Sequence, residues 1–290
     1  MAAMTGQTDR LQAELDRPTS WPDRPARRGA PRKTVASWLF LLLGVVYFAL
    51  PLVGTLIFSL RAKPMLSAWT DMLNDPQVWS TLGYSFVIGL ITIIVSIVLL
   101  VPTAFWVRLR LPRLRPIVEF VTLLPFVVPP IVLVFGLITT FSRPPLPLTG
   151  TNLGSDVLLV CAYVILSLPY MYRAVDAGLR TIDIRTLTEA CQSLGAGWFT
   201  ILWRVILPNL RVSILSGAFL TLAIVVGEFT IANFLARPMF ATYLQLIYGN
   251  LAYQPAAVAL ISFGITWGAM GVIALIGRGS QDKSEIGGAH

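Results

Sequence analysis

Few side chains in this 290-residue chain can do chemistry on a metal or a proton. There is one histidine, His290 at the last position, and two cysteines, Cys161 and Cys191. Metal centres need several such ligands close together, and histidine catalysis needs a histidine beside partner groups. Two separate cysteines do not indicate a disulfide framework either. We therefore expect no metal and no cofactor in this chain, and no catalytic site.

Nucleotide hydrolysis is the next chemistry to consider. A phosphate-binding P-loop places a lysine directly after the pattern G-x-x-x-x-G. The three lysines are Lys33, Lys63 and Lys283, and none of them follows such a pattern. The chain therefore has no P-loop of its own for binding ATP.

One carboxylate lies deep in an apolar run, at Gly227-Glu228-Phe229. On insertion scales a carboxylate at the centre of a membrane costs about 2.5–3.5 kcal/mol, so such a group usually faces a cavity or a partner. Glu228 is the best candidate for lining a solute path, together with Phe229 and Asn233. A structural, inter-subunit hydrogen bond made by a neutral Glu228 is an equally open alternative.

Prolines mark a second unusual segment, within 116–141. Pro125, Pro129 and Pro130 interrupt this apolar run. Each internal proline removes a helical hydrogen bond, and the freed carbonyl needs a donor or an aqueous cavity. Discontinuous helices often line transport routes. Pro129 and Pro130 are therefore candidates for the solute path, although a role in packing alone remains open.

We expect Glu228 and the prolines of the third run to lie on membrane helices. The chain is 56% hydrophobic and 12% charged, against a usual charged fraction of about 25%, and its mean hydropathy is +0.74. A hydrocarbon core about 30 Å thick needs about 20 helical residues, and unpaired backbone groups in lipid exclude most alternatives. We predict an all-α membrane protein with six transmembrane helices. The six apolar runs lie near 35–60, 79–107, 116–141, 156–175, 212–236 and 254–277.

The net charge of +8 follows the predicted topology. Eighteen of the 22 lysines and arginines fall on one side if the N-terminal segment is cytoplasmic, and only Arg61, Lys63, Arg143 and Arg237 fall on the other. This bias agrees with the positive-inside rule and predicts two cytoplasmic termini. Orientation explains the charge, so nucleic acid is not an expected partner.

An amphipathic segment, 183–208, separates the fourth and fifth runs. A helix there has a narrow stripe of apolar side chains at i, i+3, i+4 and i+7, and such a stripe indicates a partner groove. The stripe consists of Leu187, Ala190, Cys191 and Leu194. Asp183 or Thr186 can cap the helix, and Thr186 and Glu189 have capping-box spacing.

The same segment contains two predicted stops. Gly195 can end the first helix because glycine adopts the left-handed conformation without strain. A second helix is expected around Trp198 to Ile206, ended by Pro208.

These residues resemble a known motif, the EAA loop of the membrane-spanning subunits of binding-protein-dependent ABC importers. The motif reads EAA, three residues, Gly, nine residues, Ile, one residue, Leu-Pro. The matching positions here are Glu189, Ala190, Gly195, Leu207 and Pro208. Cys191 replaces the second alanine and Val205 replaces the isoleucine.

The resemblance implies the type I ABC importer permease (MetI-like) fold over 35–277, with a cytoplasmic coupling helix in a bacterial inner membrane. It implies that Leu187, Cys191 and Leu194 belong to the surface that couples the permease to its ATPase subunits, along with the motif positions. It further implies ATP and Mg in those ATPase subunits, a second permease subunit, more often a different one, and an extracytoplasmic substrate-binding protein. Both permeases would form one alternating-access pathway in the lipid membrane.

Substrate identity is only weakly indicated. The third run resembles that of the polyamine, ferric-iron and thiamine branch of these permeases. Gly227-Glu228-Phe229 resembles the same segment of the polyamine, iron, thiamine, molybdate and sulfate permeases, and a carboxylate suits a cation. We expect a polyamine or a similar small solute, with ferric iron, thiamine, sugars and oxyanions as alternatives. A stand-alone secondary transporter would leave the amphipathic segment unexplained, and a membrane enzyme would need convergent ligands.

Three segments complete the organisation. Residues 1–34 are rich in proline and arginine and predict a disordered, basic cytoplasmic tail, and 278–290 predict a second cytoplasmic tail. The loop 142–154 is stiffened by three prolines. It is a candidate docking surface for the binding protein, with a plain turn as the alternative.

Overall fold

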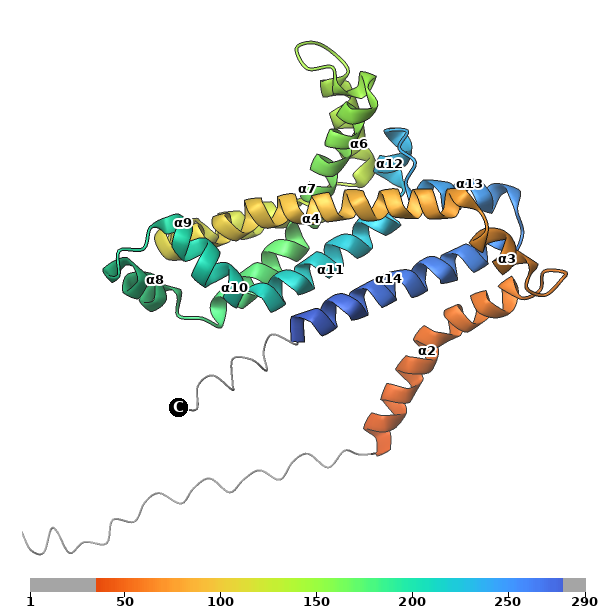
Figure 1. Ribbon diagram of the computed structural model, residues 1–290, viewed down its shortest axis with the longest axis horizontal. Coiled ribbons are helices and arrows are strands. Elements are labelled where there is room, and N and C mark those ends of the chain that lie inside the picture. Colours follow the sequence, from red (N-terminus) through yellow and green to blue (C-terminus); the bar gives the residue numbers. More distant parts are fainter. Residues whose placement is uncertain (1–34, 279–290) are drawn as a thin grey trace, which may run out of the picture. The chain divides into compact units, whose positions relative to one another are not determined.

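A computed structural model describes residues 35–278, in which all regular structure is helical (Figure 1). The predictions for 1–34 and for residues after 278 lie outside this range. The chain divides into two units, one ending at Pro51 and one beginning at Leu52. The boundary falls inside α2 (Val35–Ser59). The packing, site and cavities described below concern the second unit.

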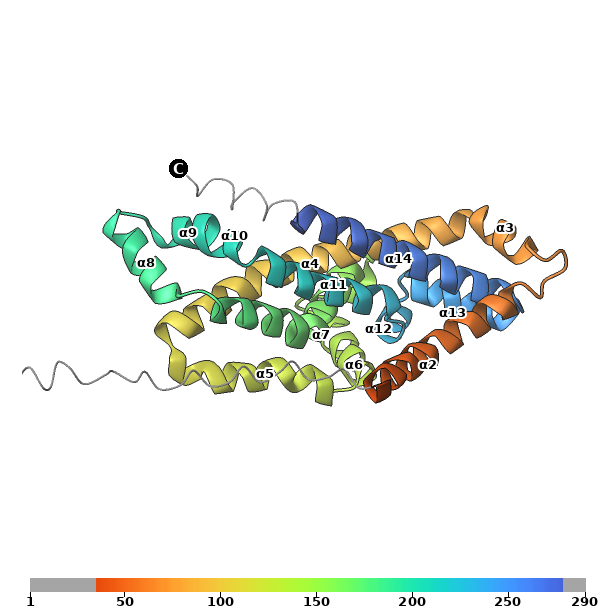
Figure 2. The same cartoon turned by 90° about the horizontal axis from the view of Figure 1, so that it is seen from below.

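Three helices form the centre of this unit: α4 (Pro76–Arg110), α7 (Asn152–Arg180) and α11 (Arg211–Gly227). They pack against one another, and α14 (Gln254–Arg278) lies beside α11 (Figures 1 and 2). Close approach of α7 and α11 requires Gly178, because a Cβ there would lie 2.4 Å from the Ser213 Oγ. The second and fourth apolar runs are thus confirmed as helices, each somewhat longer than predicted.

The number of membrane spans is less regular than the sequence suggests. Within the described residues, three helices are long and apolar enough to cross a membrane: Ser37–Ser59, Pro76–Arg110 and Asn152–Arg180. Two bent helix pairs raise the number to five if each pair is one span. The sixth run corresponds to α14, only part of which has described side chains. Exactly six spans therefore stays a prediction.

The third run is broken rather than kinked. It forms α5 (Arg115–Val127) and α6 (Pro130–Phe141), and the pair is bent by 96°. A residue before a proline avoids the helical region, and accordingly Val128 and Pro129 are both extended. Two successive prolines thus produce a corner where one proline would produce a bend.

The fifth run also stops early. α11 ends at Gly227, Glu228 is extended, and a short helix α12 (Thr230–Phe234) follows. A further helix, α13 (Phe240–Asn250), occupies a segment that we expected to be an external loop. The prediction of one continuous span over 212–236 is therefore wrong at its C-terminal third.

Candidate functional site

The amphipathic segment forms α8 (Ile184–Ser193), which lies beyond the end of α4 in Figure 1. Asp183 caps it: one carboxylate oxygen accepts from the Thr186 backbone N–H at 3.2 Å and the other from the Thr186 hydroxyl at 2.7 Å. These bonds, the hydroxyl first, lower the pKa of Asp183, so the cap is ionised at neutral pH. Of the two predicted caps, Asp183 is the one used.

The predicted capping box does not form. Glu189 instead pairs with Arg185 one turn earlier, with 2.9 Å between Oε1 and Nε. Both side chains are exposed, and an exposed helical pair of this kind stabilises by only about 0.3–0.5 kcal/mol. The Glu189 carboxylate is therefore held on the outer surface of α8.

Gly195 ends α8 as predicted. Its φ of +79° is left-handed, the Gly195 N–H donates to the Gln192 carbonyl at 2.9 Å, and the Ala196 N–H donates to the Cys191 carbonyl at 3.0 Å. This pair of bonds is the Schellman motif. Nothing lies within 4 Å of a Cβ built at Gly195, so the requirement for glycine is one of backbone conformation alone.

The predicted apolar stripe divides into two faces. Cys191 is half-buried and packs, with Ile184, against the core formed by α4 and α7. Leu187 is half-buried, Ala190 is exposed and the Leu194 side chain is 88% exposed. Cys191 thus attaches α8 to its own chain, Ala190 and Leu194 face outward, and Leu187 lies partly exposed beside them.

A second helical segment, Trp198–Asn209, leads from α8 to α11. It consists of α9 (Trp198–Ile201), a π-helical turn (Leu202–Ile206) and α10 (Leu207–Asn209), and the chain then bends by 75°. Pro208 cannot donate a helical hydrogen bond, which agrees with the irregular turn just before it. Leu207 is half-buried and Pro208 is exposed.

Trp198 fixes this segment to the end of α4. Its ring lies 5.1 Å from that of Trp106, and the Arg110 guanidinium lies 4.9 Å above it. Ile201 and Ile206 are fully buried in the same core that receives Ile184. α8 is therefore connected to the helical bundle at both of its ends.

Glu228, the first candidate for the solute path, accepts hydrogen bonds from other residues of the same chain. Both of its carboxylate oxygens lie 3.0 Å from the Ile231 backbone N–H at the start of α12, and one also accepts from the Tyr163 hydroxyl at 3.1 Å. Free N–H groups at a helix start favour a carboxylate. These contacts give Glu228 a structural role within its own chain, rather than the inter-subunit hydrogen bond considered from the sequence.

The other path candidates are only partly brought together. Phe229 and Asn233 line a cavity of about 610 Å³, whose other residues are Gln77, Ser80, Thr81, Pro238, Thr242, Tyr243, Gln245 and Leu246. None of these lining residues is charged. Pro129 and Pro130 lie at the α5–α6 corner and do not line this cavity.

Two ionic clusters were not anticipated as units. In the first, which we call the Asp176 cluster, Asp176 on α7 contacts Arg108, Arg115 and Arg180 at 3.3, 3.2 and 2.6 Å. Glu119 pairs with Arg115 at 2.8 Å. The i, i+4 spacings of Arg115 with Glu119 and of Asp176 with Arg180 are the local sequence signals for this cluster.

In the second, the Asp156 cluster, the Arg237 Nε lies 2.6 Å from the Asp156 carboxylate. The Tyr84 hydroxyl donates to Asp156, and Arg237 also donates to Asn152 at 2.9 Å. The cluster joins α4, α7 and the segment after α12. No sequence pattern indicated it, since its members are far apart in the chain.

Membrane-length apolar helices, two sharply bent helix pairs and an exposed amphipathic helix inserted between α7 and α11 define a membrane transport subunit. The chain belongs to the family of inner membrane components of binding-protein-dependent transport systems, whose model matches residues 100–283. It is accordingly an all-helical ABC importer permease with the MetI-like fold, and its family is one of transport permeases rather than enzymes.

Similar proteins carry different substrate names. A probable molybdenum ABC transporter permease protein of Haloferax volcanii is 30% identical over 86% of this chain and 94% of its own length. The putrescine transport system permease protein PotI of Escherichia coli is 23% identical over 82% and 88%. The thiamine transport system permease protein ThiP of Haemophilus influenzae is 25% identical over 76% of this chain and 40% of its own length.

Proposed function

We propose that α8 is the coupling helix through which separate ATPase subunits drive this permease. The observation that carries the proposal is the outward face of Leu187, Ala190 and Leu194 on a helix that is capped, stopped and attached to the core. An exposed apolar face of this kind suits the groove of a partner protein. The motif residues Glu189, Gly195, Leu207 and Pro208 maintain its geometry.

The mechanism that we propose is alternating access. Binding of ATP and Mg by two ATPase subunits displaces α8, and the buried contacts of Ile184, Cys191 and Trp198 transmit the displacement to α4 and α7. ATP then biases a two-state bundle formed with a second permease subunit. In this proposal α8 and both chain termini are cytoplasmic, the membrane is a bacterial inner membrane, and a binding protein docks on the opposite face, where the loop 142–154 is a candidate contact.

The substrate is a small solute delivered by that binding protein. A polyamine was the first expectation, because Glu228 could attract a cation. The Glu228 carboxylate now has Ile231 and Tyr163 as partners, which weakens that argument. Phe229 and Asn233 remain the candidate path residues, beside uncharged side chains. Identification of the solute that co-purifies with the cognate binding protein decides between a polyamine and the alternatives.

The coupling role can be tested at Gly195. We expect Gly195→Val to abolish uptake by the reconstituted transporter, because a β-branched residue at φ +79° costs about 1–3 kcal/mol and disrupts the Schellman motif. The matched control is Gly197→Val, since Gly197 has an ordinary φ of −76° and open space around it. Normal uptake by the Gly195 variant, with ATPase activity still coupled, would contradict the proposal.

A second substitution separates docking from helix geometry. Leu194→Glu alters an 88% exposed side chain and should leave the thermal unfolding of the permease unchanged. We expect it to reduce the amount of ATPase that co-purifies with the permease. Gln192→Glu, also exposed on α8, adds the same charge as a control. Equal recovery of ATPase with the Leu194 variant and the wild type would remove the outward face from the contact.

A further inference from the structure

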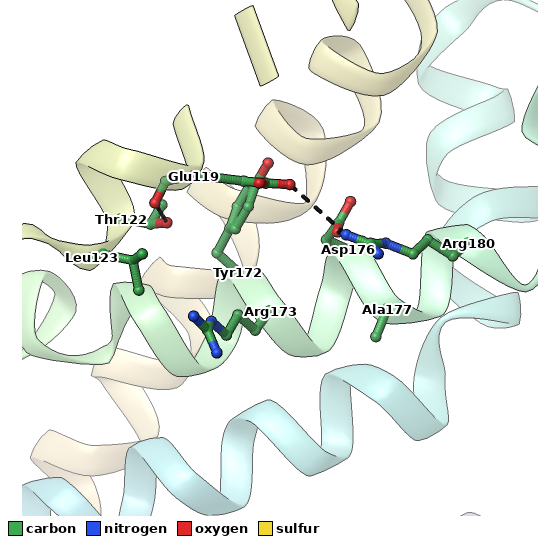
Figure 3. Close-up of a pocket in the computed structure, with 8 residues that line it drawn as sticks. All are labelled: Glu119, Thr122, Leu123, Tyr172, Arg173, Asp176, Ala177 and Arg180. Carbon is green, nitrogen blue, oxygen red and sulfur yellow. Dashed lines mark hydrogen bonds and ion pairs between the residues drawn. The ribbon is translucent and has the colours of Figure 1, made fainter. Parts of the chain in front are cut away.

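A cavity of about 370 Å³ lies between α5 and α7, in the Asp176 cluster (Figure 3). Its wall from α5 is formed by Glu119, Thr122 and Leu123, and its wall from α7 is formed by Tyr172, Arg173, Asp176, Ala177 and Arg180. The proposed coupling role of α8 makes no use of this cavity. Its charges and free hydrogen-bond donors nevertheless indicate a ligand.

The charges around the cavity do not balance. Asp176 and Glu119 are two carboxylates, and three guanidinium groups, those of Arg108, Arg115 and Arg180, contact them. Arg173 adds a fourth guanidinium group, for which the described part of the chain records no ion pair or hydrogen bond. The charged side chains that line the cavity, Glu119, Asp176, Arg173 and Arg180, balance one another. Arg108 and Arg115, which contact these carboxylates from outside the lining, add two positive charges, and this excess favours an anion over a cation.

The cavity lining includes hydrogen-bond donors that have no partner among the described residues. Arg173 and Arg180 are two helical turns apart on α7; in Figure 3 the Arg180 side chain points toward Asp176 and the Arg173 guanidinium points away from it. The Tyr172 hydroxyl lines the same cavity and makes no hydrogen bond to any described residue. Asp176 is itself saturated by arginines and its side chain is 10% exposed, so it offers an anion little repulsion.

We propose that this cavity binds a phosphate-type oxyanion through Arg173, the Tyr172 hydroxyl and the exposed part of Arg180. A guanidinium group offers parallel N–H donors that match two oxygens of a phosphate group, and such charge-assisted bonds are strong. The oxyanion has two possible sources, a lipid headgroup or a free solute. The site lies near the end of α7, 20 residues from Asp156 near its start, or about 30 Å along a helix. That separation equals the hydrocarbon thickness, so a lipid source requires that Asp156 lie near one membrane surface and the cavity near the other.

The test uses the purified full-length chain and three probes: phosphatidylglycerol, diacylglycerol, which lacks the phosphate, and inorganic phosphate. Native mass spectrometry measures lipid retention, and thermal unfolding measures stabilisation by inorganic phosphate. If the source is lipid, phosphatidylglycerol is retained over diacylglycerol. If the source is a solute, inorganic phosphate raises the unfolding temperature and the two lipids are retained equally.

In either case Arg173→Gln should weaken binding of the effective probe by about tenfold, as the loss of one charge-assisted hydrogen bond predicts. Tyr172→Phe should weaken it less, and Arg173→Lys should restore part of it. The matched control is Arg113→Gln, an exposed arginine near the same end of the bundle that does not line the cavity. Arg173 has no recorded ion pair to break, so its variant should fold.

The proposal is overturned if the Arg173 variant binds each probe as the wild type does. It is also overturned if Arg113→Gln reduces binding as much as Arg173→Gln does, because the attraction would then come from general surface charge. Failure here leaves the coupling role of α8 intact, since that role is read from uptake and from recovery of the ATPase.

Discussion

Two aspartates on α7 are held in opposite ways. Asp176 contacts three arginines, from α4, from the start of α5 and from α7 itself. Asp156 contacts one arginine, Arg237, which comes from the link between α12 and α13. The two carboxylates are separated by about 30 Å of helix, a distance comparable to the thickness of a membrane's hydrocarbon core.

This difference in the number of arginines indicates which end of the bundle should tolerate the loss of one side chain. At the Asp176 cluster the arginines are redundant, so that end of α4, α5 and α7 stays joined when one of them is lost. At the Asp156 cluster the attachment of the α12–α13 link depends on one guanidinium group, supported by Tyr84 and Asn152. An alternating-access bundle needs parts that move apart, and we expect the singly held end to separate more easily.

The largest effect is expected from Asp176→Asn. This change removes the negative charge of Asp176, which three neighbouring guanidinium groups contact. Loss of one partner of a buried ion pair costs roughly 3–5 kcal/mol. Because these arginines are 26–54% exposed, we expect a smaller loss of unfolding free energy, roughly 2–3 kcal/mol. Denaturant unfolding of the purified chain measures it. A loss no larger than that caused by Arg108→Gln would show that the carboxylate does not organise the cluster.

Arg237→Gln should have the next largest effect. Asp156 would keep only the Tyr84 hydroxyl, and a polar group left without its partner costs about 1–3 kcal/mol. The double variant with Asp156→Asn should lose less than the sum of the single losses, because the two residues interact directly. If the two losses of unfolding free energy are additive, the Arg237–Asp156 ion pair does not contribute to stability.

Arg108→Gln tests whether the three arginines around Asp176 are redundant. Its contact with Asp176, at 3.3 Å, is the longest of the three, and two arginines remain when it is removed. We expect a loss of less than about 1 kcal/mol in the same unfolding measurement. If Arg108→Gln destabilised the chain more than Arg237→Gln does, the proposed redundancy would be wrong.

The sequence predicted features that depend on neighbouring residues. Asp183 as a cap and Gly195 as a stop follow from the local needs of a helix end, and the structure confirms both. The apolar runs of α4 and α7 follow from the requirements of a lipid environment. The resemblance of the α8 segment to the EAA loop identified the family, which the comparison with known permeases confirms.

The sequence did not predict features that depend on distant partners. Cys191 matched the apolar stripe by spacing, but the position of the core places it on the inward face of α8. The role of Glu228 depended on Tyr163, 65 residues away, and α13 depended on packing against α4 and α14. Pro129 and Pro130 indicated an interrupted helix, but the 96° angle between α5 and α6 could not be predicted from the prolines alone.

The smallest effect is expected at Ala236, which positions Arg237. Ala236 has a φ of 51°, its N–H donates to the Asn233 carbonyl at 3.1 Å, and the Arg237 N–H donates to the Ala232 carbonyl at 2.9 Å. This is the motif that ends α8, with alanine where α8 has Gly195. A left-handed alanine costs about 1–2 kcal/mol, and the greater freedom of glycine in the unfolded chain offsets about 0.4–1 kcal/mol of that strain.

We therefore expect Ala236→Gly to raise the unfolding free energy by less than about 1 kcal/mol. Ala236→Val, with a branched side chain at the same φ, should lower it. If glycine stabilises the chain, the left-handed backbone at Ala236 strains the turn that carries Arg237, the residue that pairs with Asp156. A destabilising glycine would mean that the alanine methyl group contributes packing that outweighs the strain, and the Asp156 end would then be held more firmly than its one ion pair suggests.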